Sequence, residues 1–284
     1  MLERRLWALV CPVAIALFTT APAVDLRDTH EQLNPVLWMQ TSGEYWALSA
    51  SAYARAAAQL SAGLKDKSRT AATEQAGAYK KLPPAVILDL DETVLDNSPY
   101  QGYLVRNRST YDTGTWNAWV MQHRATAIPG VVEFLEFAAK SHVTPFFVSN
   151  RTADQKAVTI RNLQDLGIAA TADTVLLNGE NGWTSDKTSR RAFVARSHRI
   201  LLLVGDDLGD FVTVTDPALD ARRDAARKYA SWWGDRWILL PNAMYGGWER
   251  SLSASGLSDA ETLAARKARL RAFDPAGSYP APIH

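Results

Sequence analysis

Cysteine is nearly absent from this chain: Cys11 is the one cysteine among 284 residues. It lies inside an N-terminal apolar run, so the rest of the chain has no thiol for a nucleophile, a disulfide or a thiolate zinc site. Histidine is scarce as well, with five positions and none of the paired spacing typical of metal ligands: His30, His123, His142, His198 and His284. These shortages exclude cysteine-dependent catalysis and argue against a histidine nucleophile.

An excess of charge of either sign is also missing. The formal net charge is +1, which gives no electrostatic basis for binding a nucleic-acid polymer or a membrane surface. The G-x-S-x-G pattern of serine hydrolases and the G-x-x-x-x-G-K-[ST] pattern of P-loop nucleotidases do not occur. Apolar residues make up 47% of the chain, enough for one folded domain with a smaller companion.

No apolar run is long enough to span a membrane. The longest, LWALVCPVAIALF, has about 13 residues, whereas a spanning helix needs roughly 20. Arg4 and Arg5 precede it and Ala21-Pro22-Ala23 follows, which is the pattern of a cleavable signal peptide over residues 1–23. We therefore expect a periplasmic or secreted protein without stable membrane insertion after cleavage. Cys11 lacks the small preceding residue of a lipid-attachment site.

Strand-like and helix-like segments alternate through most of the chain. Residues 24–82 show helical spacing and are expected to form the N-terminal helical segment of the smaller domain. From residue 83 to 250, continuous apolar runs alternate with helical segments; the runs are 85–90, 143–148, 174–177, 199–205 and 236–241. This alternation predicts an α/β fold with a Rossmann-like, doubly wound parallel sheet covered on both faces.

Other signals mark the ends and interruptions of these elements. The aromatic-rich stretch 97–128 is too long for a simple connection and predicts a cap insertion, and residues 251–284 predict a C-terminal helix and tail. Two capping boxes, Thr152 with Gln155 and Ser258 with Glu261, predict helix starts. Pro129 predicts the first turn of another helix, and Gly167 predicts a helix end.

Three of the predicted strands end in polar side chains. Asp89 and Asp91 end the first, Ser149 and Asn150 the second, and the segment 206–210 holds three acids after the fourth. Ligands bind outside the carboxyl ends of such strands, so these groups are expected to converge. Oxygen ligands without histidine or cysteine suit Mg²⁺, which would compensate the charge of several neighbouring carboxylates.

Turn formation is the alternative explanation for these acids. Aspartates often cap the turn after a strand, and for Asp96 and Asp210 this alternative stays open. It explains Asp89 and Asp91 poorly, because a turn does not require two acids behind a buried strand. The hydroxyl of Thr93 is expected to fix the turn. An EF-hand is excluded because its sixth and twelfth positions would be valine and tyrosine rather than glycine and glutamate.

The motifs together resemble those of a known enzyme family. DLDETV matches the D-x-D-x-T motif of haloacid-dehalogenase-type (HAD) phosphohydrolases, and the chain as a whole is similar to the bacterial class C acid phosphatases. The segments that carry the resemblance are LWMQTSGEYWAL (37–48), DLDETVLDNSPYQGY (89–103), VSNR (148–151), GDDLGDF (205–211) and PNAMYGGWE (241–249).

The resemblance implies roles for the strand-end residues. Asp89 would be the nucleophile and Asp91 the general acid and base. Mg²⁺ would be held by carboxylates of Asp89 and Asp206 and by the backbone carbonyl of Asp91. Asp207 and Asp210 would be auxiliary.

The same resemblance implies the substrate contacts. Ser149, the backbone around Asn150, and Lys187 would bind phosphate, although two arginines lie close to Lys187 in the sequence. Trp116 and Tyr245 would sandwich an aromatic ring, while the alternative for both is a place in the core. Gly247 stands where the family commonly has serine.

The sequence therefore predicts an exported, Mg²⁺-dependent acid phosphatase acting on small phosphate monoesters, aromatic or nucleoside, through an aspartyl-phosphate. Two alternatives stay open: a phosphotransferase, and a non-catalytic metal- or phosphate-binding module on the same fold. The sequence does not determine the oligomeric state.

Overall fold

The structure, a computed structural model, describes residues 31–215 and 218–270. The described residues fall within one compact unit, Glu31–His284. The predicted signal peptide, residues 1–23, and the predicted tail after residue 270 lie outside the described residues. None of the helices in the described ranges combines the length and apolarity needed to cross a membrane.

Five parallel strands form the central sheet. In chain order they are β1 (Pro84–Leu88), β4 (Thr144–Thr152), β5 (Val175–Asn178), β6 (Arg199–Gly205) and β7 (Trp237–Leu239). Their order in the sheet is β5-β4-β1-β6-β7, and every neighbouring pair is parallel. This confirms the predicted doubly wound sheet. The chain order reverses at β1, so the carboxyl ends of β1, β4 and β6 meet at the position where such folds bind ligands.

One face of the sheet packs against α2 (Gly43–Lys65) and α5 (Val131–Lys140). Val86 and Leu88 of β1 belong to this core, because alternate residues of a strand point to the same face. The helix α6 (Lys156–Asp165) contributes to the same core.

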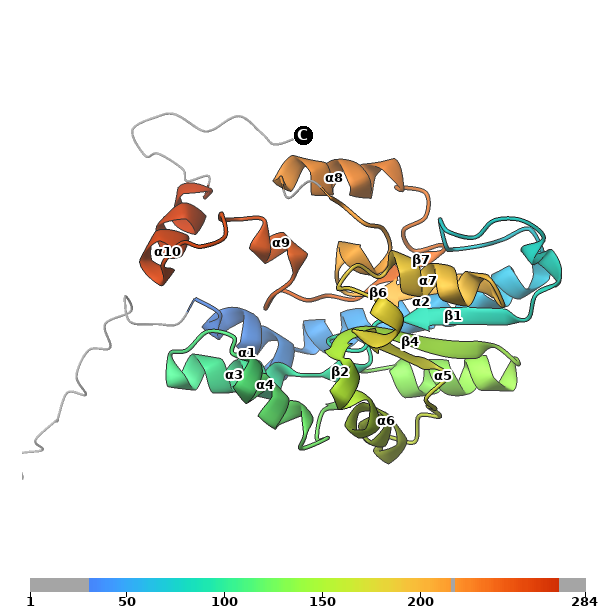
Figure 1. The fold of residues 1–284 in the computed structure, drawn as a ribbon, viewed down its shortest axis with the longest axis horizontal. Coiled ribbons are helices and arrows are strands. Elements are labelled where there is room, and N and C mark those ends of the chain that lie inside the picture. The colour runs from blue at the N-terminus through green and yellow to red at the C-terminus, as the bar shows by residue number, and fades with distance from the viewer. Residues whose placement is uncertain (1–30, 216–217, 271–284) are drawn as a thin grey trace, which may run out of the picture. The chain divides into compact units, whose positions relative to one another are not determined.

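The opposite face is covered by α7 (Thr188–Ala195) and by an aromatic group around the buried Trp237. Ala85 and Ile87, the alternate residues of β1, belong to this second core. Figure 1 shows α5 and α7 on the two sides of β1 and β4. A strand buried on both faces explains the uninterrupted apolar runs that marked the sheet in the sequence.

The predicted cap insertion forms a small helical group. It contains α3 (Ser98–Asn107) and α4 (Thr113–Val120), and it is framed by the antiparallel pair β2 (Leu95–Asp96) and β3 (Thr126–Ala127). The N-terminal helix α1 (Leu33–Thr41) packs against α3. Helix α1 of the predicted N-terminal segment thus joins the cap, whereas α2 covers the sheet.

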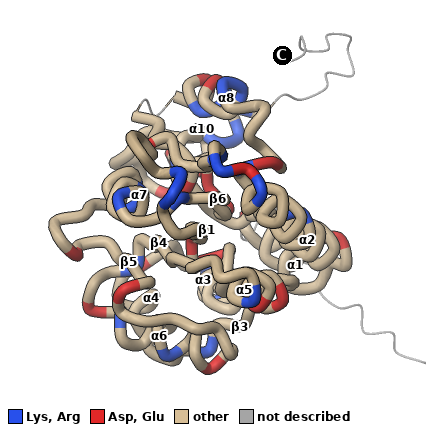
Figure 2. Tube along the Cα trace, turned by 90° about the vertical axis from the view of Figure 1, so that its right-hand side faces the viewer, with Lys and Arg blue, Asp and Glu red and all other residues tan. Residues whose placement is uncertain are grey.

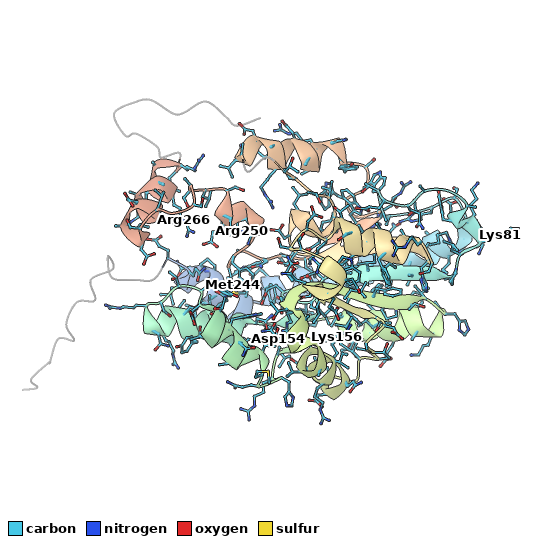
Figure 3. The ribbon with its side chains drawn as sticks, in the orientation of Figure 1. Lys81, Asp154, Lys156, Met244, Arg250 and Arg266 are labelled. Carbon is cyan, nitrogen blue, oxygen red and sulfur yellow. The ribbon has the colours of Figure 1, made fainter. Side chains whose placement is uncertain are left out.

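The C-terminal part, as far as residue 270, contains the helices α8 (Leu219–Lys228), α9 (Gly247–Arg250) and α10 (Asp259–Ala268). Figure 2 shows both acidic and basic positions on α8. Arg266 of α10, labelled in Figure 3, pairs with Glu249 of α9 at 2.8 Å. Four single-turn 3₁₀ helices complete the described elements: η2 (Tyr79–Lys81), η3 (Ala153–Gln155), η4 (Glu180–Gly182) and η5 (Leu208–Asp210).

The helix-end signals were largely correct. Both predicted capping boxes are present, and Gly167 adopts a left-handed φ of 77° just after α6. Pro129 was assigned wrongly to a first helical turn. The helix α5 begins at Val131, after Gly130 with a φ of 90°. A side chain on Gly130 would also lie 3.2 Å from the Cα of Ala50, so glycine here permits the close approach of α2.

Candidate active site

The turn after β1 separates the first two acids of the site. Three consecutive backbone amides, those of residues 93–95, donate to the carbonyl oxygen of Leu90 at 2.8–3.3 Å. Glu92 adopts a left-handed φ of 60° within this turn. The prediction that the Thr93 hydroxyl fixes the turn was wrong. That hydroxyl instead donates to Oδ1 of Asp206 at 3.0 Å and ties the turn to the end of β6.

Three carboxylates gather at the ends of β1 and β6. Asp89, Asp206 and Asp210 each offer one oxygen, and these oxygens lie within 4.8 Å of one another. Lys187, which precedes α7, donates to Oδ1 of Asp89 and, at 2.7 Å, to Oδ1 of Asp210. A Cβ at Gly205 would collide with the side chain of Asp210, so glycine is required at the end of β6.

Burial makes this cluster electrostatically costly. Asp89 is 8% exposed, and burial raises its pKa to about 7 against the opposing effect of Lys187. Burial, together with Asp210 and Asp89, also raises the pKa of Asp206 well above its ordinary value. Burial alone would lower the pKa of Lys187, but the carboxylates of Asp210 and Asp89 raise it.

The donor set of the cluster fits a divalent cation. One ammonium faces three carboxylates, so two negative charges stay uncompensated when all three acids are ionised. Carboxylate oxygens are the ligands that Mg²⁺ prefers. The resemblance implied an auxiliary role for Asp210, whereas the structure places one of its carboxylate oxygens in the cluster with those of Asp89 and Asp206.

Asp91 lies in different surroundings. Its Oδ1 accepts from Nη2 and Nε of Arg151 at 2.8 and 3.0 Å, and from Nδ2 of Asn97 at 2.9 Å. Its Oδ2 accepts from Oγ of Ser149 at 3.3 Å. The cluster of carboxylates that could hold a cation, as found among the described residues, does not include this carboxylate. The backbone carbonyl of Asp91, which the sequence analysis assigned to the metal, keeps that role as a prediction.

Asn97 connects Asp91 to the cap. Its Oδ1 accepts from Nε1 of Trp119 at 2.8 Å, and its backbone amide donates to Oε1 of Glu92 at 2.8 Å. Glu92 is fully buried, and this burial raises its pKa well above the ordinary range. The loop that carries Asp91 is thus fixed to α4 by hydrogen bonds.

The predicted phosphate-binding residues come from β4 and from the segment before α7. Ser149 is buried at the end of β4, next to Asp91, and Lys187 reaches Asp89. The side-chain oxygen of Asn150 accepts from Nη2 of Arg190 at 2.7 Å. Lys187, rather than Arg190 or Arg191, contacts the acid cluster through its side-chain nitrogen. Arg191 donates to the carbonyl oxygen of Asp210 at 3.1 Å.

The remaining acids form turns. Asp207 accepts from the backbone amide of Gly209 at 2.8 Å and from that of Gly247. Burial opposes the shift, yet these amides lower the pKa of Asp207. Oδ1 of Asp96 accepts from the amide of Ser98 at 2.8 Å.

Asp210 has both of the roles considered from the sequence. Its Oδ2 accepts from the backbone amides of Asp206 and Asp207 at 3.1 and 2.9 Å, which closes the turn after β6. Its Oδ1 meets Lys187 in the cluster.

The two predicted ring-binding residues differ in their surroundings. Trp116 of α4 is half-buried, with its ring 5.2 Å from that of Tyr100 and 5.8 Å from the guanidinium of Arg151. Arg151 contacts both the Trp116 ring and the carboxylate of Asp91, so it links the two side chains. Tyr245 is half-buried and packs against the core. The preceding Met244, labelled in Figure 3, accepts from Nε2 of Gln32 beside α1.

Sequence reasoning missed several of the basic and amide side chains of the site. Arg151, Asn97 and Arg190 had no assigned role, although the first two lie within the quoted motifs. An arginine directly after Ser149-Asn150 at a strand end was the available signal for Arg151.

The fold and the site together define an α/β protein with a carboxylate centre where the strand order reverses. Residues 12–248 match the family described as HAD superfamily, subfamily IIIB (acid phosphatase). The chain belongs to this family, a group of phosphomonoesterases, which confirms the resemblance found in the sequence.

Solved structures agree with this assignment. The class C acid phosphatase from Bacillus anthracis is 35% identical with a TM-score of 0.76, and the match covers 86% of this chain and 98% of that one. A tungstate-bound structure of the class C acid phosphatase from the same organism matches over the same shares at 33% identity, with a TM-score of 0.76.

Curated relatives match over a shorter part. Acid phosphatase 1 from Solanum lycopersicum is 25% identical over 130 residues, 44% of this chain and 51% of that protein. The stem 28 kDa glycoprotein of Glycine max is 25% identical over 134 residues, 44% of this chain and 52% of that protein. The chain therefore spans about half the length of these relatives.

Proposed function

We propose that this chain is an exported, Mg²⁺-dependent acid phosphatase that hydrolyses aromatic or nucleoside monophosphates through an aspartyl-phosphate. The observation that carries the proposal is the buried contact of Asp89 with Lys187 inside the cluster of Asp89, Asp206 and Asp210. A nucleophile for phosphorus must stand where negative charge is compensated, and this cluster supplies one cation and a binding place for another. Export rests on the sequence pattern of residues 1–23.

Mg²⁺ would be held by carboxylate oxygens of Asp89, Asp206 and Asp210, together with the backbone carbonyl of Asp91. When bound, it would neutralise charge on the transferring phosphoryl group. Thr93, which donates to Asp206, and Asn242, whose Nδ2 donates to the same carboxylate at 2.8 Å, would orient one of the ligands.

The reaction would proceed in two steps. A carboxylate oxygen of Asp89 forms a bond to phosphorus while the bond from phosphorus to the leaving oxygen breaks, and Asp91 gives its proton to that oxygen. Asp91 then accepts a proton from water, whose oxygen attacks the phosphorus of the aspartyl-phosphate. Free phosphate leaves and the carboxylate of Asp89 is restored.

Positive charge and hydrogen-bond donors around the phosphate would come from three places. Lys187 would offset the combined charge of phosphate and Asp89, since its ammonium already contacts Asp89. The hydroxyl of Ser149 and the backbone around Asn150 would donate to phosphate oxygens from the end of β4. Arg190 supports this edge because its Nη1 also donates to the carbonyl oxygen of Ser149.

Recognition of the leaving group would involve Trp116. Its ring lies over Arg151, which contacts Asp91, so an aromatic group stacked on Trp116 would stay close to the proton donor. Tyr245 would supply a second ring surface. The glycine at position 247 makes room for Arg222, because a Cβ there would collide with the Arg222 guanidinium.

The test is the hydrolysis of 4-nitrophenyl phosphate by residues 24–284 with Mg²⁺ and with EDTA, beside Asp89→Asn. We expect metal-dependent release of 4-nitrophenol that disappears in the variant. Release by folded Asp89→Asn at near wild-type rates would contradict the nucleophile assignment. No release by folded wild-type protein would favour the non-catalytic module. A phosphotransferase would transfer phosphate to added glycerol instead of releasing it.

A further inference from the structure

The two oxygens of Asp91 are held unequally. Oδ1 accepts three N–H donors at 2.8–3.0 Å, two from Arg151 and one from Asn97. Within the described ranges, Oδ2 receives only two longer contacts, both at 3.3 Å, from Oγ of Ser149 and Nε of Arg151. The single Nε–H of Arg151 is shared between both oxygens, and its contact to Oδ2 is the longer branch. A carboxylate oxygen has two lone pairs, so the three short donors occupy Oδ1 fully, whereas Oδ2 has one full donor, the Ser149 hydroxyl, and keeps a lone pair for a proton. Oδ2 is also the oxygen beside Ser149, the residue proposed to hold the phosphate.

Arg151 is buried within the site and is held there by several contacts. It is 3% exposed, and its Nη1 donates to Oγ1 of Thr159 on α6 at 3.2 Å. Its Nη2 also lies 3.5 Å from Oδ1 of Asn97. Its guanidinium lies under the ring of Trp116. Contacts to α6, α4 and the β1 turn therefore fix the plane of the guanidinium, and a planar fork fixes the carboxylate that it binds.

We propose that Arg151 is the positioning residue for proton transfer: by occupying Oδ1 of Asp91, it leaves Oδ2 as the oxygen that delivers the proton to the leaving group. This inference rests on the proposed function and assigns a role inside it. The bonds made and broken are those of the first step above. Arg151 takes no proton and touches no substrate atom.

The dependence of rate on the leaving group distinguishes this role from a structural one. A 4-nitrophenolate leaves without needing a proton, whereas an alkoxide does need one. Misplacing the proton donor should therefore slow the cleavage of alkyl phosphates far more than that of 4-nitrophenyl phosphate. General loss of folded enzyme would slow both equally.

The experiment compares kcat/KM for 4-nitrophenyl phosphate and 2-phenylethyl phosphate in wild type, Arg151→Gln and Arg151→Lys. For Arg151→Gln we expect a loss of roughly 100-fold with the alkyl ester and less than about 5-fold with the aryl ester. Arg151→Lys keeps the positive charge but not the planar fork of the guanidinium. The ratio of its loss in kcat/KM for the alkyl ester to its loss for the aryl ester should lie between those of wild type and Arg151→Gln.

A matched control is Arg199→Gln. Arg199 is a buried arginine outside the site, and its Nη1 donates to the carbonyl oxygens of Gly63 and Asp66. It should lower folded stability without changing the ratio between the two substrates. Equal losses of kcat/KM for both substrates in the Arg151 variants would overturn the proposal. If Arg151→Gln does not fold, the same comparison is made with Arg151→Lys alone. Failure of the proposed function is separate, because wild type would then cleave neither ester.

Discussion

Asp89 and Asp91 are separated by one residue, yet they occupy two different electrostatic regions. Asp89 faces two further carboxylates and one lysine, and its burial disfavours the charged form. Asp91 faces an arginine fork, an amide and a hydroxyl. The first region has too much negative charge without a cation, whereas the second is compensated by the protein itself. The first region could hold a cation, whereas the second fixes the orientation of its carboxylate.

The backbone turn at Leu90 creates this difference. On a continuing strand, residues two apart share a face and would share one environment. Because three amides converge on the carbonyl of Leu90, the chain leaves the strand between the two acids. The separate partners of the proposed nucleophile and the proposed proton donor follow from that turn.

Exchanging each aspartate for asparagine should have the largest effect. Asp89→Asn and Asp91→Asn should each lower kcat by about 100-fold or more, because one removes the nucleophile and the other the proton donor. In EDTA their stabilities should move in opposite directions. Asp89→Asn relieves repulsion and should raise the melting temperature. Asp91→Asn weakens the pairing of buried Arg151 and should cost about 1–3 kcal/mol. Thermal unfolding of both variants in EDTA measures these changes in stability. Melting-temperature shifts of the same sign would contradict the proposed difference between the surroundings of Asp89 and Asp91.

The pH dependence of stability should sharpen the contrast next. Burial raises the pKa of Asp89 from 3.8 to about 7, so the native state of metal-free protein binds a proton that the unfolded state releases. The stabilisation is complete below about pH 4 and is lost as the pH rises through about 7. The expected loss is on the order of 1–4 kcal/mol. Urea unfolding in EDTA at pH 5 and pH 8 measures it, and Asp89→Asn should show a smaller change.

Disturbing only the carboxylate cluster proposed to hold Mg²⁺ should lower activity less than replacing either aspartate. Gly205→Ala would push Asp210 out of the cluster, so the Mg²⁺ concentration for half-maximal activity should rise about 10-fold or more. Overpacking should cost about 1–3 kcal/mol of folding stability. Gly43→Ala is the control, because nothing lies within 4 Å of a Cβ at that position. An unchanged Mg²⁺ requirement in Gly205→Ala would place Asp210 outside the metal site.

The smallest effect is expected on the cap. Trp116→Ala should raise KM for aromatic phosphates by roughly 5- to 10-fold, which is the low end of what stacking contributes. KM for glycerol phosphate should stay unchanged. Trp46→Ala, which replaces a tryptophan 62% exposed on α2, is the matched control. Equal changes in KM for both substrates would argue that Trp116 serves the core of the cap rather than the substrate.

Local patterns made much of the site predictable. The apolar runs predicted all five strands of the sheet, since a strand buried on both faces needs apolar residues throughout. The acids after β1 and β6 predicted a carboxylate centre because parallel strands end at the same edge. The family match then confirmed the family resemblance that these motifs carry.

Partners distant in the sequence were not predictable in the same way. Arg151 and Asp91 are 60 positions apart, and Lys187 and Asp89 are 98 apart. The sequence offered three basic residues near position 187 and gave no geometric reason to choose among them. It also left Asp210 between two roles that the structure shows to be compatible, one for each carboxylate oxygen.

The sheet, the strand-end acids and the family resemblance could be predicted without a structure, because they depend on residue type and on spacing along the chain. The pairing of each charged side chain with its partner depends on the three-dimensional fold. Ion pairing depends on distances of a few ångströms between side chains that the fold brings together, and no local pattern encodes those distances. The separation of Asp89, in a carboxylate cluster that could hold a cation, from Asp91, bound by an arginine, therefore comes from the fold.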